Sequence, residues 1–109
     1  MQATEAIGQV TAAAERLCAQ EGMSAARARQ VRWFVKELRL ALAHPEFTPG
    51  EPVSTAADFF QPQAVSSYLE LGRRGELRTR ASSVPGAVSS PASMRVREDC
   101  LKLIARELT

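Results

Sequence analysis

The sequence predicts an all-α protein, a single domain built as a bundle of four to five helices. In four separate segments, apolar residues recur every three or four positions, which is the period of an amphipathic helix. Runs of β-branched residues, which are typical of strands, do not occur. The chain has 109 residues, the size of one domain, and 45% of them are hydrophobic, enough for one core without disulfides or a metal.

Two long helices are expected in the first part of the chain. The first has Thr4 as its expected N-cap and reaches about Gln20, with Gly22 as the stop signal. Ser24 is expected to cap a second helix over Ala25–Ala43, and a loop with three prolines follows at 44–52. The inner faces of the two helices are expected at Ile7, Val10, Ala14 and Leu17, and at Ala28, Val31, Val35, Leu38 and Leu42.

A short helix and a medium one are expected next. Thr55 and Asp58 have the spacing of a capping box, which predicts a helix of about one turn. Pro62 suits the first turn of a following helix that runs to about Leu71 and stops at Gly72. The apolar face of that helix is expected at Val65, Tyr68 and Leu69.

The last helix follows a flexible loop expected at 79–91, which is rich in serine and contains two prolines. Ser90, or Ser93 as the alternative, is expected to cap this helix, which continues to Leu108. The sequence thus divides into an N-terminal helix within residues 1–23 and a bundle over 24–108. One shared core is expected to contain Val31, Val35, Leu38, Val65, Leu69, Val96, Cys100 and Ile104.

The residue inventory argues against catalysis. The single histidine, His44, precedes a proline at an expected helix end, so it is interpreted as a capping or solvent-facing residue. Phosphate-binding glycine loops and metalloprotease motifs are absent from the sequence. Cys18 and Cys100 lack metal-ligand spacing and are expected to stay reduced. We therefore expect no catalytic residue, no metal site, no cofactor and no enzymatic activity.

Neither a secretion signal nor an apolar run long enough to span a membrane is visible in the sequence. A cytoplasmic location and no membrane partner are the resulting expectations.

Charge is strongly segregated although the formal net charge is only +2. Residues 24–43 contain five Lys or Arg and one acidic residue, Glu37, whereas residues 44–70 contain four acidic residues and no basic one. In the second helix, four cations recur at spacings of three, four and three, which predicts a row on one face. This set, called the basic row below, consists of Arg29, Arg32, Lys36 and Arg39.

A second basic segment contains only arginines, whose planar guanidinium suits phosphates and guanine edges. Serine hydroxyls near the start of the last helix add groups that favour a phosphate there. Arg95 and Arg97 occupy the beginning of that helix, where base edges are commonly reached. The candidate DNA contacts outside the basic row are Arg73, Arg74, Arg78, Arg80, Ser90, Ser93, Arg95 and Arg97.

Three segments in order resemble the core-binding (SAM-like) domain of tyrosine recombinases, the phage-integrase family. They are VRWFVKELRLAL at 31–42, the stretch 60–69 with Val65, Tyr68 and Leu69, and the serine-started helix 90–104. The resemblance covers about residues 24–108. It departs from the family in the longer loop 79–91 and in the missing catalytic domain.

By this resemblance, the chain is the DNA-clamping part of a site-specific recombinase or integrase, with double-stranded DNA as ligand. A catalytic domain or further protomers of the same protein are the other implied partners. The alternative is a helical protein-interaction or regulatory adaptor domain. The acidic stretch 46–70 fits a basic protein partner, and it equally fits a face turned away from DNA. The alanine-rich surface of the first helix fits docking of either another protein or the missing catalytic domain.

Overall fold

The helical periodicity of the sequence becomes five α-helices in the structure. The structure is a computed structural model that describes residues 2–77 and 88–109, with only the backbone of Gln2 and Ala3. Over these ranges it contains no strand, so the predicted all-α bundle is confirmed. The elements are α1 (Gln2–Cys18), α2 (Ala25–Ala43), α3 (Ala56–Phe59), α4 (Pro62–Arg73) and α5 (Pro91–Leu108).

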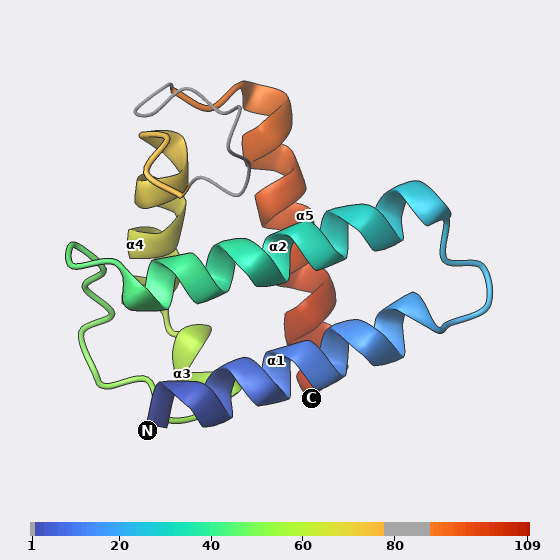
Figure 1. Cartoon of the computed structure of the whole chain (residues 1–109), viewed down its shortest axis with the longest axis horizontal. Coiled ribbons are helices and arrows are strands. Elements are labelled where there is room, and N and C mark those ends of the chain that lie inside the picture. The colour runs from blue at the N-terminus through green and yellow to red at the C-terminus, as the bar shows by residue number, and fades with distance from the viewer. Residues whose placement is uncertain (1, 78–87) are drawn as a thin grey trace.

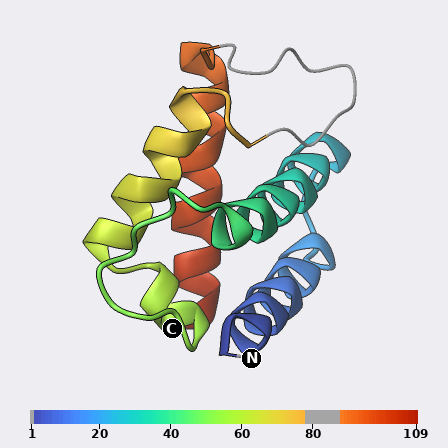
Figure 2. The ribbon, with the colours of Figure 1, turned by 60° about the vertical axis from the view of Figure 1, so that its left-hand side comes forward.

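The helices form two layers. α1 and α2 run antiparallel as a hairpin, and the pair α4 and α5 crosses behind them, with α3 below (Figures 1 and 2). The largest fully buried side chains between the layers are Tyr68, Phe34, Phe59 and Leu38. Phe34 and Phe59 both contact the Tyr68 ring, at centroid distances of 5.7 and 6.0 Å. The aromatic side chains therefore join α2, α3 and α4 into one core.

The N-terminal helix belongs to this same core. Its inner face consists of small residues with a few larger ones, and Ala6, Val10, Ala13 and Leu17 are all buried. Short side chains at a helix contact allow the helix axes to approach closely, so α1 packs tightly on α2. Over the described ranges, no helix combines the length and the apolar character that crossing a membrane requires.

Most helix starts follow the predicted capping chemistry. Ser24 Oγ accepts a hydrogen bond from the Arg27 backbone N–H at 3.0 Å, and Ser90 Oγ accepts one from the Ser93 N–H at 3.1 Å. Asp58 Oδ2 accepts the Thr55 N–H at 3.0 Å, as expected for the capping box. These side chains satisfy N–H groups that have no partner inside the helix.

Two predicted helix ends are wrong. α1 already begins at Gln2, so Thr4 lies inside the helix and caps nothing. α4 runs past Gly72, because Gly72 is a buried helical residue and the left-handed turn is made by Gly75 at φ 73°. Gly72 has a packing role instead: a Cβ there would lie only 2.7 Å from Nε of Arg97. The glycine makes room for another side chain rather than ending the helix.

The predicted core is correct at five of its eight positions, all on α2 and α5, and it is shifted on α4. Val31, Val35, Leu38, Cys100 and Ile104 are buried as expected. Val65, Leu69 and Val96 lie only partly buried at the edge of the core. On α4, Tyr68 is buried as predicted, and the other apolar side chains on its inner face are those of Ala64 and Leu71. This face lets the Tyr68 hydroxyl reach a carboxylate of α2.

The loop predicted at 79–91 lies mostly outside the described residues. Of that stretch, the structure describes Val88, Ser89 and Ser90, and it assigns Pro91 to α5.

Replacing Leu38 or Ile104 by alanine is expected to lower the free energy of unfolding by about 2–5 kcal/mol, because each side chain is fully buried and its removal leaves a cavity. Urea unfolding followed by circular dichroism measures this. The matched control is Leu40→Ala on the same helix. Leu40 is 39% exposed, and its replacement is expected to stay within about 0.5 kcal/mol. Equal destabilisation at Leu38 and Leu40 would contradict this packing.

Candidate nucleic-acid interface

The basic row lies on the solvent side of α2. All four side chains, Arg29, Arg32, Lys36 and Arg39, are exposed, as their spacing predicts. At a rise of about 1.5 Å per residue the row is about 15 Å long. Within the described part of the chain, none of the four makes an ion pair or a side-chain hydrogen bond. The row therefore presents four unneutralised cations on one rigid helix.

The one acidic residue of α2 does not offset these cations. Glu37 is only 1% exposed and its carboxylate points into the protein. There it accepts two hydrogen bonds from Arg97 of α5, from Nε to Oε1 and from Nη2 to Oε2, both at 2.8 Å. The Tyr68 hydroxyl of α4 donates a third hydrogen bond to Oε1 at 2.8 Å. Three helices thus meet at one buried carboxylate.

Arg97 is held on all sides. Its Nη1 donates to Ser89 Oγ at 2.9 Å, and its guanidinium carbon lies 5.2 Å from the ring centroid of Trp33. Ser89 Oγ in turn donates to the backbone carbonyl of Gly72 at 2.6 Å. We call Glu37, Tyr68, Ser89 and Arg97 the buried network. It joins α2 and α5 to the end of α4 through charge-assisted hydrogen bonds.

Burial and the carboxylate together determine the protonation states in the network. Burial and the adjacent Glu37 carboxylate raise the pKa of Tyr68 well above its ordinary value, so the phenol stays neutral. Burial acts to lower the pKa of Arg97, but the hydrogen bonds and charge of Glu37 outweigh it and the net change is upward. Arg97 is therefore a permanent cation paired with Glu37.

In this fold, Arg97 is therefore not available to contact DNA as the sequence predicted. The side chain is 4% exposed and all of its polar contacts lie within the protein. A duplex reaching it would have to displace Glu37, which would leave a buried carboxylate unpaired. Arg95, two positions earlier on α5, is exposed and makes no ion pair within the described ranges. It remains the candidate at the start of this helix.

Of the four other arginines predicted to contact DNA, two form ion pairs within the protein and two lie outside the described residues. Arg73 is exposed but makes a two-point contact with Glu70, and the resulting hydrogen bonds lower the pKa of that carboxyl. Arg74 lies 3.3 Å from Glu46. Both arginines are thus neutralised by carboxylates of their own chain, which makes them poorer phosphate ligands than the basic row. Arg78 and Arg80 lie outside the described residues.

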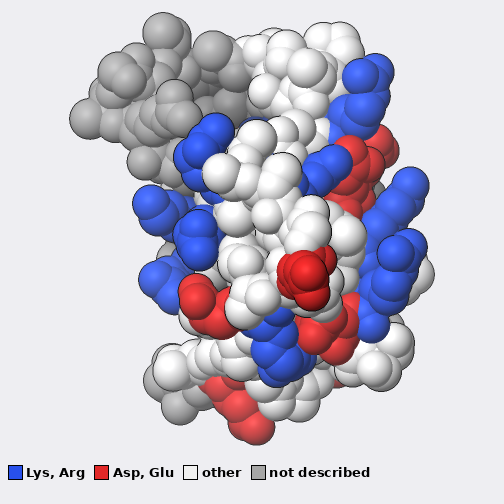
Figure 3. Space-filling model, turned by 90° about the vertical axis from the view of Figure 1, so that its right-hand side faces the viewer, with Lys and Arg blue, Asp and Glu red and all other residues white. Residues whose placement is uncertain are grey.

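The structure brings the start of α5 beside the basic row. Arg29 at one end of the row and Ser93 on α5 line the same groove, of about 360 Å³, together with Trp33 and Gln30. Ser90 itself is exposed, but its hydroxyl serves the N-terminus of α5. Figure 3 views the molecule from the end where α1 connects to α2. It shows Lys and Arg side chains along the left and right edges and a further group low in the middle, with acidic side chains between them.

One group of potential metal ligands comes together within the described ranges: His44, Glu46 and Glu76, whose ligand atoms lie within 4.8 Å of one another. His44 Nδ1 accepts the Glu46 backbone N–H at 3.1 Å, and its Nε2 lies 3.4 Å from Glu76 Oε1. Arg74 Nη2 donates to Glu46 Oε1 at 3.3 Å. The ligand atoms of this cluster are thus engaged by contacts within the chain.

The two cysteines are free thiols, Cys100 fully buried and Cys18 partly buried. Burial raises the pKa of Cys100 to about 11, with Asp99 adding to the shift. A thiol with this pKa is almost entirely protonated at neutral pH, so Cys100 is a core residue rather than a nucleophile.

The buried network is not among the predictions made from the sequence, although a signal for it exists. Glu37 lies three positions after Phe34 and four before Ala41, so the helical period places it on the inner face of α2. Arg97 is likewise three positions before Cys100 on α5. An acid and a base on two inner faces indicate a buried pair.

Comparison of the chain with protein families, curated proteins and solved structures finds no match. The resemblance to the core-binding domain of tyrosine recombinases accordingly stays a prediction from sequence.

Replacing Glu37 by alanine is expected to destabilise the protein by about 3–5 kcal/mol, because the Arg97 charge stays buried without a partner. The double variant Glu37→Leu with Arg97→Met removes both charges and is expected to lose less stability than Glu37→Ala alone. Urea unfolding measures both. A double variant less stable than the single one would contradict the charge-burial explanation.

The phenol of Tyr68 is expected to ionise only when the protein unfolds. Its raised pKa means that the folded state retains the proton, whereas an unfolded chain releases it near pH 10. The stabilisation is therefore complete below about pH 10 and is lost as the pH rises further. Tyr68 is the only tyrosine, so phenolate absorbance reports this residue alone. Absorbance and circular dichroism should change together; ionisation with unchanged helicity would refute the buried hydrogen bond.

Proposed function

We propose that this chain is a non-catalytic module that binds double-stranded DNA through the exposed face of α2. The observation that carries the proposal is the basic row: four exposed cations without a carboxylate partner in the described part of the chain. The only acidic residue of the helix is engaged in the buried network. A polyanion placed along the row relieves repulsion between cations three and four positions apart.

The dimensions of the row suit a duplex backbone. Double-stranded DNA carries about one negative charge per 1.7 Å of its axis, so a row of about 15 Å meets several phosphates. The buried network joins α2 to α4 and α5 by hydrogen bonds, so the helix that carries the basic row is fixed in position by the core. Contacts of this type set affinity and orientation and carry no sequence information.

Under this proposal, any preference for a particular DNA sequence comes from residues at the start of α5. Arg95 is exposed there, and Ser93 shares a groove with Arg29 of the row. A guanidinium at this position reaches base edges when the helix start enters a major groove. The role in a site-specific recombinase or integrase is the finer part of the proposal, and only the sequence resemblance supports it.

Replacing Lys36 or Arg39 by alanine is expected to weaken binding to all duplexes alike. The slope of log affinity against log salt should become shallower by about 0.9 for each phosphate that the protein no longer neutralises. The intact protein is expected to bind non-specifically with a dissociation constant on the order of 10⁻⁴–10⁻⁶ M at physiological salt. Fluorescence anisotropy with a labelled duplex at two or more salt concentrations measures both quantities.

Arg16→Ala is the matched control, because it removes the same charge from an exposed arginine that Glu107 of α5 already pairs at 3.0 Å. This variant should leave the affinity and the salt slope nearly unchanged. If Arg16→Ala and Lys36→Ala changed the affinity equally, binding would depend on the net charge of the protein and not on the basic row. Unmoved amide signals over 29–39 in the presence of duplex DNA at low salt would rule the interface out.

A further inference from the structure

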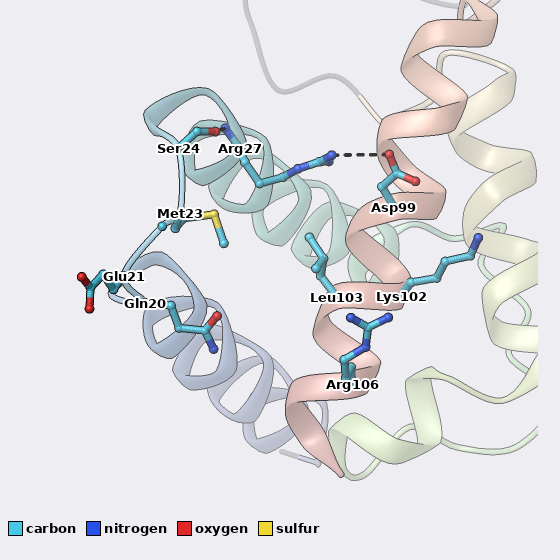
Figure 4. Close-up of a pocket in the computed structure, with 10 residues that line it drawn as sticks. Gln20, Glu21, Met23, Ser24, Arg27, Asp99, Lys102, Leu103 and Arg106 are labelled. Carbon is cyan, nitrogen blue, oxygen red and sulfur yellow. Dashed lines mark hydrogen bonds and ion pairs between the residues drawn. The ribbon is translucent and has the colours of Figure 1, made fainter.

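A second groove opens on a different part of the surface, between the α1–α2 turn and α5 (Figure 4). Its volume is about 640 Å³. Met23 from the turn and Leu103 from α5 provide apolar surface on its two sides, and both are only partly buried. We call it the Leu103 groove. Its size accommodates a few side chains of a partner rather than the width of a duplex.

The charges around the Leu103 groove are unevenly balanced. Arg27 is paired with Asp99 at 3.6 Å across the upper end of the groove. The carboxylate of Glu21 points away from the opening (Figure 4). Lys102 and Arg106, one helical turn apart on α5, have no ion-pair partner within the described ranges. The groove therefore combines an apolar centre with two cations from α5. Arg106 lies below Leu103, whereas the Lys102 side chain extends along α5 away from Met23 and borders the groove with its base (Figure 4).

The groove and the basic row occupy different sides of α2. Arg27 lines the groove and Arg29 belongs to the row, and two positions in an α-helix are about 200° apart. An occupant of the groove consequently leaves the row accessible.

We propose that the Leu103 groove docks a short acidic segment of a partner protein, with one apolar side chain between Met23 and Leu103 and carboxylates at Lys102 and Arg106. Charge complementarity selects the acidic segment, because the two cations lack carboxylates of their own within the described ranges. The apolar centre favours a peptide over DNA, since a phosphate backbone offers nothing to bury against methionine and leucine methyl groups. The proposal is independent of DNA binding at the basic row.

The probe is a fluorescein-labelled peptide of glutamates around one leucine. Two control peptides replace the leucine by glycine or the glutamates by glutamine. Methyl-labelled methionine gives a direct readout, because the chain has three methionines and Met23 is the one in the groove. The Met23 methyl signal should shift on titration, while Met94, which lies beside Arg97, should not. Either control peptide should bind at least several-fold more weakly.

The decisive variants are two pairs of charge reversals on exposed residues. Lys102→Glu with Arg106→Glu is expected to weaken peptide binding about tenfold. Lys36→Glu with Arg39→Glu reverses the same number of charges on the basic row and should change peptide binding less than twofold. Unchanged circular dichroism verifies the fold of both proteins.

Three outcomes would overturn the proposal. The first is a Met23 signal that stays fixed at saturating peptide. The second is a Lys102→Glu/Arg106→Glu protein that loses duplex binding as strongly as the basic-row variant, which would make the groove part of a nucleic-acid surface. The third is a Met23 shift that follows protein concentration without peptide, because a second copy of the chain would then be the occupant.

Discussion

The buried pair of Glu37 and Arg97 is the constraint on which the arrangement of α2, α4 and α5 depends. Removing two charges from water costs several kcal/mol each, and only good geometry with further hydrogen bonds offsets that cost. Here the geometry is a two-point contact at 2.8 Å, completed by the Tyr68 hydroxyl and Ser89. Gly72 is needed for this geometry, since the Cβ of any other residue there would collide with the Arg97 side chain. Register and orientation of the three helices are thereby specified together.

The same pair decides how charge is distributed over the surface. With Glu37 buried, the charged side chains on the outer face of α2 are all cations, and with Arg97 buried, the start of α5 exposes one arginine fewer. α2 then presents a different feature on each of three sides: the exposed basic row, the inner carboxylate of Glu37, and Arg27 at the Leu103 groove. With DNA on one side and an acidic protein segment on another, as proposed, this small domain would connect the two.

Local chemistry determined much of the fold in advance. The bounds of α2, the caps at Ser24 and Ser90, the capping box of Thr55 and Asp58, and the exposure of the basic row all follow from residues within one or two turns of each other. Such features depend on hydrogen bonds and periodicity inside a single helix. A sequence contains that information without reference to distant segments.

Only the tertiary structure decided which residues of α4 face inward and which arginines are available to a ligand. It also decided that Gly72 makes room for the Arg97 side chain rather than ending a helix. Glu37 and Arg97 are 60 positions apart, and the pairings of Arg74 with Glu46 and of Arg16 with Glu107 also join distant segments. A cation seen in sequence is equally compatible with a phosphate contact and with an internal ion pair. The difference depends on which carboxylate folding places beside it, and that follows from the packing of whole helices against one another.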